Sequence, residues 1–406
     1  MTTAFFFRIC ADSQKELVTS YESYKRSITA TGSSILLGHK PDLQTKTYSY
    51  AKAAASIELL AKQIVKEQPQ EPIKKASNNK IAMLFTGQGS QLAFMGQELY
   101  QTQTLFRKTF DQCCNLLTNY LDGVNIKDII FNNDPKQLNN TLYTQPALFV
   151  LEYCIATLWH HWGVNTNFVM GHSVGEYPAA CFATYLSMAD GLALIAKRAQ
   201  LMQRLPTGGA MAAVMASAVE VKKIITEDIE IAAINAPKQT VIAGDKIIIE
   251  KYINIFKENK IKCRELVVSH AFHSYLMEPM LSEFTEFAKY INYQESHIAL
   301  VSNLTGNIIK YSELSSHYWK DHVREKVKFL DGLATIDNAG TNIYLEVGPQ
   351  PFLIGLAQKS LRSSAEDRHY LASLKKNTSN LLTMLETAVE LDKLGVNIKW
   401  HQIESI

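Results

Sequence analysis

The chain has 406 residues, of which 47% are hydrophobic and 20% are charged, and its formal net charge at pH 7 is +2. This near-neutral charge gives no electrostatic reason to expect nucleic acid or an anionic membrane as a partner. No apolar run approaches the roughly 18 residues of a membrane span, and the short run at residues 4–7 is followed by Arg8, whereas a signal peptide carries its basic residues first.

The six cysteines do not have the spacing of a metal site, and most of them lie in apolar segments. Thiols in such surroundings are usually buried and reduced, as in cytosolic proteins. We therefore expect a cytoplasmic chain that holds no metal ion and no disulfide. The neighbouring residues Cys113 and Cys114 leave a redox pair open as an alternative.

Residues 1–75 are predicted to form a small α+β subdomain. Two strand-type segments alternate with two helical patterns, in the order strand 4–10, helix 13–28, strand 47–52 and helix 56–66. A polar stretch with two prolines and no periodicity follows at residues 67–80 and is typical of a linker.

A second core begins at the strand-type residues 81–85, which lead into the turn Thr86-Gly-Gln-Gly-Ser-Gln91. The glycines allow close approach to the backbone of this turn. The turn has neither the lysine nor the spacing of a nucleotide P-loop. We predict that it donates N–H groups to an oxyanion, with Gln88 as a donor, and a structural tight turn is the alternative.

The stretch Gly171-His-Ser-Val-Gly-Glu176 lies between a strand-type run at 167–170 and a helical pattern at 177–186. A G-x-S-x-G pattern in this context predicts a strand-to-helix elbow that exposes a serine nucleophile, here Ser173. The same turn would aim the N–H of Val174 at the reacting group. A chance match within a Gly/Ser loop is the alternative.

The helical pattern at residues 193–202 carries Arg198 beside Lys197. On local grounds Arg198 is interpreted as a solvated surface charge. A further pattern, in the order strand 210–215, helix 219–225, strand 229–234, strand 239–243, helix 246–259 and strand 263–268, is typical of a ferredoxin-like unit.

This unit, residues 209–270, is predicted to be inserted into a larger α/β subdomain formed by residues 76–208 and 271–376. The main sheet resumes with strands at 298–302 and 341–347. Residues 377–406 are predicted to be a C-terminal helix and tail, with the helix at 381–394 and Gly395 as its C-cap residue.

Two histidines, His270 and His273, follow the last strand of the ferredoxin-like pattern. Because a serine hydroxyl needs an adjacent base, His273 is predicted to be the general base of Ser173. No aspartate or glutamate is an obvious partner for the imidazole, so a backbone carbonyl could orient it. A satisfied structural histidine is the alternative.

The chain carries six motifs in the order Gly87-Gln-Gly-Ser-Gln91, Tyr143-Thr-Gln-Pro-Ala-Leu148, Gly171-His-Ser-Val-Gly-Glu176, Asn235-Ala-Pro237, His270-Ala-Phe-His273 and Glu346-Val-Gly-Pro349. Together they resemble the motifs of the malonyl-CoA:acyl-carrier-protein transacylases, the acyltransferase family of fatty-acid and polyketide synthesis. The flanks are similar to polyketide synthase acyltransferases, including the linker subdomain before them. The resemblance therefore covers nearly the whole chain and implies an α/β-hydrolase-like catalytic subdomain.

The resemblance implies a ping-pong transfer in which Ser173 attacks the thioester of malonyl-CoA and His273 removes its proton. An acyl carrier protein then takes the acyl group on its phosphopantetheine thiol, and no cofactor is required. Gln88 and Val174 match the oxyanion-hole positions, and His322 matches the position whose backbone carbonyl orients the imidazole. Gln145 and Asn235 match positions that line the site.

Arg198 matches the arginine that pairs with the free carboxylate of the extender unit, so the resemblance replaces the local interpretation. The form His270-Ala-Phe-His273 accompanies malonyl units, since Phe272 would crowd a branch at C2. One methyl group is worth only about 1–3 kcal/mol of discrimination. An unusual malonyl unit with a small polar substituent at C2, delivered on a carrier protein, therefore stays open.

We expect a free-standing, trans-acting enzyme that serves separate carrier proteins as a monomer, although an excised domain of a larger synthase would look similar. An acyl hydrolase that clears carrier proteins with the same Ser173 and His273 is the alternative enzyme. A non-enzymatic docking subunit is the alternative from another class, and the intact Ser173, His273 and Arg198 argue against it.

Overall fold

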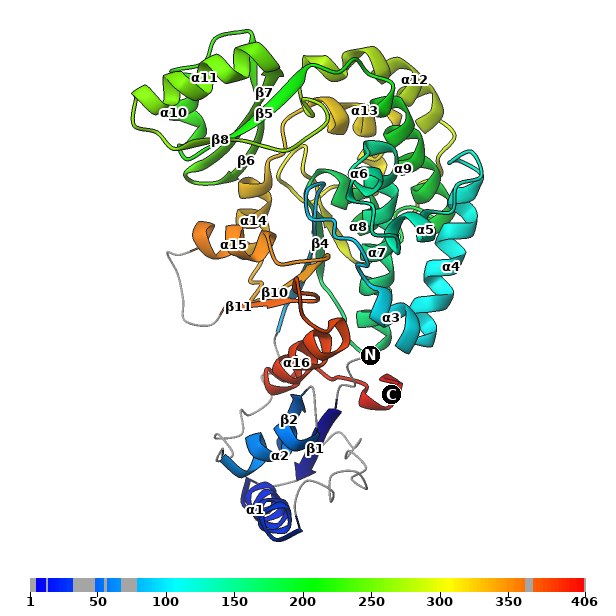
Figure 1. Cartoon of the computed structure of the whole chain (residues 1–406), viewed down its shortest axis with the longest axis vertical. Helices are drawn as coiled ribbons and strands as arrows, with labels where there is room; N and C mark the ends of the chain where they lie inside the picture. Colours follow the sequence, from blue (N-terminus) through cyan, green and yellow to red (C-terminus); the bar gives the residue numbers. More distant parts are fainter. Residues whose placement is uncertain are drawn as a thin grey trace.

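The computed structural model describes residues 5–11, 14–31, 48–54, 57–66, 79–361 and 368–404. Its largest part is built on a five-stranded sheet with the order β11-β10-β3-β4-β9, in which every neighbouring pair is parallel (Figure 1). The strands are β3 (Ile81–Phe85), β4 (Phe168–Gly171), β9 (Ala299–Val301), β10 (Ile343–Val347) and β11 (His369–Ala372). Strands β3, β4 and β10 are buried throughout, as helices on both faces of a parallel sheet require.

Helices lie on both sides of this sheet, with α7, α8 and α9 on one side of β4 and α14 and α15 on the other (Figure 1). Helix α7 is apolar on nearly every face and most of its residues are buried, which is typical of a central helix. The helices of this part are α3 (Gln97–Thr102), α4 (Thr104–Thr118), α5 (Ile126–Ile130), α6 (Pro135–Leu138), α7 (Thr141–His161), α8 (Glu176–Phe182), α9 (Met188–Gln203), α12 (Glu278–Ala288), α13 (Ser316–Arg324), α14 (Phe329–Asn338) and α15 (Leu353–Ser360). Short 3-10 turns are η2 (Ser173–Gly175), η3 (Tyr275–Met277), η4 (Tyr311–Glu313) and η5 (Trp400–Gln402).

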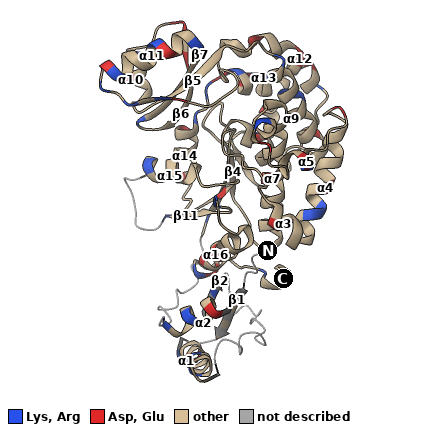
Figure 2. Cartoon of the chain, in the orientation of Figure 1, with Lys and Arg blue, Asp and Glu red and all other residues tan. Residues whose placement is uncertain are grey.

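A second sheet has four antiparallel strands in the order β6-β7-β5-β8 and carries its own apolar core. Its elements follow the predicted βαββαβ order: β5 (Gly209–Val214), α10 (Ala218–Lys222), β6 (Ile229–Ala236), β7 (Gln239–Asp245), α11 (Lys246–Glu258) and β8 (Cys263–Glu265). The last strand is shorter than expected, and Val267 beyond it is fully exposed. Basic and acidic residues are interspersed on α10 and α11 (Figure 2).

The N-terminal part pairs β1 (Phe5–Ala11) with β2 (Tyr48–Ala54) in antiparallel register and packs α1 (Gln14–Thr31) and α2 (Ile57–Lys66) on them. A separate small core forms around Phe7, Tyr21 and Ile64. Strand β2 lies beside α16 (Asn380–Lys393), which joins this part to the main sheet through β11 (Figure 1). The predicted linker at 67–80 lies outside the described residues except for Asn79 and Lys80.

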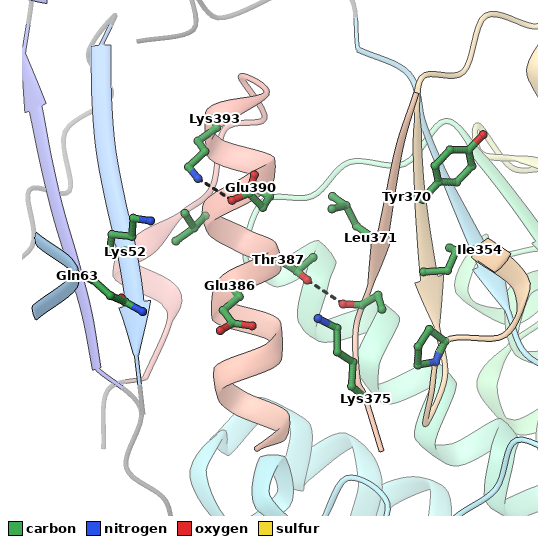
Figure 3. A pocket seen from close by; sticks show the side chains of 13 residues that line it. Lys52, Gln63, Ile354, Tyr370, Leu371, Lys375, Glu386, Thr387, Glu390 and Lys393 are labelled. Carbon is green, nitrogen blue, oxygen red and sulfur yellow. Dashed lines mark hydrogen bonds and ion pairs between the residues drawn. The ribbon is translucent and has the colours of Figure 1, made fainter. Parts of the chain in front are cut away.

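A hollow of about 410 Å³ lies where β2, α2, α16 and β11 meet (Figure 3). Lysine and glutamate side chains line it together, among them Lys52 from β2 and the ion pair of Lys393 with Glu390, whose atoms are 2.6 Å apart. None of the predicted site residues reaches this hollow, so it is not the candidate active site.

The predicted α/β class with a ferredoxin-like unit is confirmed, and the predicted domain boundaries stay predictions. The helix after the elbow ends at Phe182, earlier than expected, because Thr184 adopts a left-handed conformation with φ 65°. Among the described residues, the helices fall short of the length and apolar character that crossing a membrane requires. Five cysteines are described as free: Cys113, Cys114, Cys154, Cys181 and Cys263.

Candidate active site

Strand β4 passes directly into the turn that carries Ser173, at the carboxyl end of the parallel sheet. Ser173 has φ 52°, a left-handed conformation that non-glycine residues rarely adopt. The flanking glycines permit the close packing of this elbow. A Cβ atom on Gly171 would lie 2.0 Å from the nitrogen of Glu176, and one on Gly175 would lie 2.4 Å from the carbonyl oxygen of Phe85.

The hydroxyl of Ser173 lies 2.7 Å from Nε2 of His273, although 100 residues separate the two in the chain. On the far side of the ring, Nδ1 of His273 is 2.8 Å from the carbonyl oxygen of Glu325. A proton on Nδ1 can be donated to that carbonyl, which leaves the lone pair of Nε2 facing Ser173. The pair is thus arranged for proton transfer from the hydroxyl to the imidazole.

The expectation that the backbone carbonyl of His322 orients the imidazole is wrong. Helix α13 ends at Arg324, and Glu325 follows it in an extended conformation, so its carbonyl is free of helical hydrogen bonds and turns toward His273. The ring of His322 is instead buried, with Nε2 3.6 Å from Oε2 of Glu176.

Burial lowers the pKa of His273 well below its usual value, and the neighbouring Arg198 and His322 lower it further. The imidazole is therefore neutral near pH 7 and able to accept a proton. This protonation state is the one that a general base needs.

The local interpretation of Arg198 as a solvated charge is wrong, since the side chain is 1% exposed. Its Nη2 lies 3.4 Å from the hydroxyl oxygen of Ser173, and its Cζ lies 5.5 Å from the ring centre of Tyr177. Within the described residues, Nε and Nη1 of Arg198 have no hydrogen-bond partner. A buried and unpaired guanidinium is costly, so this place is suited to an anionic ligand beside the serine.

The turn that contains Gln88 packs directly against the elbow, because a Cβ atom on Gly87 would lie 2.7 Å from the carbonyl oxygen of His172. The backbone N–H of Gln88 donates to no acceptor in the described part of the chain. Gln88 and Val174 as oxyanion donors stay a prediction that this proximity supports.

The buried amide of Gln145 reaches the same turn, with Nε2 3.3 Å from Oε1 of Gln88. Asn235 touches the elbow from the antiparallel sheet, with Oδ1 2.8 Å from Nε2 of His172. His270 and Phe272 are buried beside each other, their ring centres 6.0 Å apart.

The hydrogen bonds of His270 lead to Ser269 and to the carbonyl of Leu205, and not to Ser173 or Arg198. Burial lowers the pKa of His270. The described residues hold no group of three or more histidine, cysteine, aspartate or glutamate side chains that suits a metal ion.

Sequence reasoning missed Asn303, which lies directly under the elbow. Its Oδ1 accepts the N–H of Ser173 at 2.9 Å, and its Nδ2 donates to the carbonyl of Gly171 at 2.6 Å. Its own N–H donates to Oε2 of the fully buried Glu176 at 2.6 Å, and Tyr318 donates its hydroxyl to the same carboxylate. The only signal in the sequence was Glu176, an acidic residue in the first turn of the helix that follows the serine.

Burial acts to raise the pKa of Glu176, but His322 and the hydrogen bonds from Tyr318 and Asn303 lower it below its usual value. Glu176 is therefore ionised, and its charge is held by several donors. This buried network fixes the backbone that presents Ser173.

A family model described as an acyl transferase domain matches residues 82–398. The phenolphthiocerol synthesis polyketide synthase type I Pks15/1 of Mycobacterium marinum is 37% identical over 329 residues, which are 80% of this chain and 16% of that protein. The crystal structure of the acyltransferase domain from the second module of the salinomycin polyketide synthase is 31% identical, with a TM-score of 0.80, and the match covers 98% of this chain and 95% of that one. The malonyl CoA-acyl carrier protein transacylase from Clostridium perfringens is 25% identical, with a TM-score of 0.70 and a coverage of 78% of this chain and 98% of that one. The chain thus spans less than a fifth of the length of the mycobacterial synthase.

Proposed function

Because the chain belongs to the acyl transferase domain family, we propose that it transfers a malonyl-type acyl group from CoA to the phosphopantetheine thiol of an acyl carrier protein. Similarity to polyketide synthases and to a malonyl CoA-acyl carrier protein transacylase supports this choice of substrates. The reaction needs no resident cofactor, since serine, imidazole, backbone N–H and guanidinium groups supply its chemistry.

In the first half of the reaction, Oγ of Ser173 attacks the thioester carbonyl while Nε2 of His273 takes the hydroxyl proton. The carbonyl of Glu325 accepts a hydrogen bond from Nδ1–H of His273 and so stabilises the imidazolium that forms. The N–H groups of Gln88 and Val174 would stabilise the tetrahedral oxyanion. The C–S bond then breaks, and the CoA thiolate leaves with the proton of His273.

In the second half, the phosphopantetheine thiol gives its proton to Nε2 of His273 and attacks the ester carbonyl. The new tetrahedral intermediate collapses, the bond between the acyl group and Ser173 breaks, and Oγ takes the proton back. The carrier protein leaves with the acyl group as a thioester.

The observation that carries the malonyl assignment is the buried guanidinium of Arg198, which lies 3.4 Å from Oγ of Ser173 with two nitrogens free of hydrogen-bond partners in the described chain. The planar guanidinium can hold the free carboxylate of a malonyl group with two hydrogen bonds. An acetyl group would leave this charge unpaired. The guanidinium therefore favours carboxylated acyl groups over simple ones.

Phe272, which is 7% exposed, directly precedes His273 and supports a limit on the size of the C2 substituent. A malonyl group, which has no substituent at C2, meets this limit better than methylmalonyl.

Intact-protein mass spectrometry after incubation with malonyl-, methylmalonyl- or acetyl-CoA tests the proposal, with Ser173→Ala as control. We expect a malonyl adduct on the native chain and none on the variant. Release of free CoA without an adduct or a carrier protein would instead indicate a hydrolase.

A further inference from the structure

A row of buried, hydrogen-bonded polar side chains lies behind the turn that contains Gln88. The row starts at Glu152, which lies on α7. Oε1 of Glu152 is hydrogen-bonded to the hydroxyl of Thr86. The hydroxyl of Thr86 lies 2.9 Å from that of Ser90, and Oγ of Ser90 donates to the carbonyl oxygen of Gly87 at 2.9 Å. Glu152 and Thr86 are fully buried, and Ser90 is 7% exposed.

The last residue of this row, Ser90, is hydrogen-bonded to a backbone peptide group, the one between Gly87 and Gln88. The carbonyl of Gly87 and the N–H of Gln88 belong to the same planar peptide unit and point in opposite directions. A hydrogen bond that holds the carbonyl of Gly87 therefore also sets the direction of the N–H of Gln88.

We propose that Glu152, Thr86 and Ser90 form a positioning chain that holds the Gly87 carbonyl and thereby aims the N–H of Gln88 at the oxyanion. This inference rests on the proposed function, which makes Gln88 an oxyanion donor. The three residues touch no substrate, so they act on the reaction through the peptide that they orient.

For the hydrogen bonds of the positioning chain to run from Glu152 to the Gly87 carbonyl, the carboxyl group of Glu152 must be protonated and neutral. Burial raises the pKa of Glu152 well above its usual value, and the nearby Glu346 adds to this effect. A neutral Glu152 donates to Thr86, Thr86 to Ser90, and Ser90 to the Gly87 carbonyl, so each hydroxyl accepts one hydrogen bond and donates one. An ionised Glu152 would accept the hydrogen bond from the Thr86 hydroxyl, and Thr86 could then no longer donate to Ser90.

The surroundings of Glu152 support the neutral form. Its Oε2 has no hydrogen-bond partner among the described residues, and a carboxylate in that position would leave a buried charge without compensation. Glu346 is differently placed, since it accepts the N–H groups of Phe352, Leu353 and Ile354 at 2.7–2.9 Å. The turn is also held from outside by Gln350, whose Nε2 donates to the carbonyl of Ser90 at 3.1 Å.

The test compares single-turnover acylation by malonyl-CoA in Ser90→Ala, Thr86→Val and Glu152→Met. Because the oxyanion forms only in the transition state, each variant should lower the acylation rate constant about tenfold or more, while the concentration of malonyl-CoA at half-saturation stays within about twofold. Glu152→Gln keeps a donor toward Thr86 and should recover most of the rate lost in Glu152→Met. A purely structural role would not give this separation of rate from binding.

The matched controls are Ser373→Ala and Thr387→Val, which remove buried hydroxyls that bond elsewhere, to the carbonyls of Glu346 and Ala372. If Ser90→Ala, Thr86→Val and Glu152→Met lose no more rate than these controls, the positioning chain is refuted. If Glu152→Met does not fold, Ser90→Ala alone decides, because its hydroxyl makes the final contact.

The same series with p-nitrophenyl acetate separates this inference from the proposed function. One outcome is that the native chain accepts no malonyl group but that Ser173 is acetylated more slowly in Ser90→Ala, Thr86→Val and Glu152→Met than in the native chain. This outcome would support the positioning chain and refute the malonyl assignment. Malonyl loading that is equally fast in native chain and variants would refute the positioning chain alone.

Discussion

Ser173 and His273 both have positive φ angles, 52° and 57°, and Oγ of Ser173 lies 2.7 Å from Nε2 of His273. A left-handed conformation costs a non-glycine residue about 1–2 kcal/mol, and it persists only where the surroundings enforce it. Here the hydrogen bonds of Asn303 hold the backbone of the elbow, and the Nδ1–H of His273 donates to the carbonyl of Glu325. The pairing of nucleophile and base is thus obtained at the expense of stability.

The strain at Ser173 predicts that Ser173→Gly is more stable than Ser173→Ala by about 1 kcal/mol, because glycine accepts a positive φ without a Cβ clash. Both variants lack the hydroxyl and should form no acyl adduct. Urea unfolding measures the difference in the free energy of unfolding. Thr184→Gly and Thr184→Ala, at an exposed residue with φ 65°, calibrate the effect outside the site. Equal stability of the two Ser173 variants would contradict the strain argument.

Removal of the guanidinium should separate malonyl from acetyl substrates. We expect Arg198→Ala to lower the rate of malonyl loading about a hundredfold or more, since the carboxylate loses its buried partner, and to change acetyl loading far less. Quantitative mass spectrometry of the Ser173 adduct measures both. Lys197→Ala is the matched control, because Lys197 carries the same charge but pairs with Glu283 at 2.5 Å. Equal losses for both acyl groups would refute the carboxylate assignment.

The lowered pKa of His273 predicts an unusual pH profile. Burial and the charge of Arg198 disfavour the imidazolium, so His273 stays neutral below about pH 6.5, where an ordinary histidine is half protonated. The kcat/KM for p-nitrophenyl acetate should therefore stay constant as the pH is lowered through that value and fall only further below it.

Arg198→Gln removes one cause of this shift, so the pKa of His273 rises and the acid limb of the profile moves to higher pH. Lys197→Gln should leave the limb where it is. An acid limb at the same pH in Arg198→Gln and the native chain would contradict the assigned electrostatic coupling.

The sequence predicts those parts of the site whose conformation is set by residues close by in the chain. The strand, the two glycines and the helix around Ser173 stand within about fifteen residues, and each has a recognisable side-chain pattern. The ferredoxin-like order is likewise readable from strand and helix periodicity. The position of Asn303 is not, because its bonds to the elbow span 130 residues or more.

The two errors about the site, concerning His322 and Arg198, have a common physical origin. A backbone carbonyl has no side-chain signature, so whether residue 322 or 325 faces His273 depends on where α13 ends. The burial of Arg198 depends on the helices packed around α9, whereas its neighbour Lys197, one position away, reaches the surface. Tertiary packing decides both, and a single sequence does not record it.

The side chain of Phe272 predicts how far the acyl specificity can be shifted. The ring is 7% exposed, directly precedes the base in the chain and lies 6.0 Å from the ring of His270. We therefore expect a smaller side chain to leave room for a substituent on the acyl group. Phe272→Ser should raise the ratio of methylmalonyl to malonyl loading about tenfold, within the 1–3 kcal/mol that one methyl group is worth. Competition between the two CoA thioesters, read by the mass of the adduct, measures the ratio.

The same substitution at an exposed phenylalanine controls for general effects on this ratio. Phe352 is 51% exposed, so Phe352→Ser should leave the ratio unchanged. Because Phe272→Ser also removes a buried ring, its stability must be measured alongside, and a loss of about 3 kcal/mol is expected. The ratio is insensitive to the fraction of folded protein, since both substrates compete for the same molecules. An unchanged ratio in a folded Phe272→Ser protein would therefore mean that another residue limits the size of the C2 substituent.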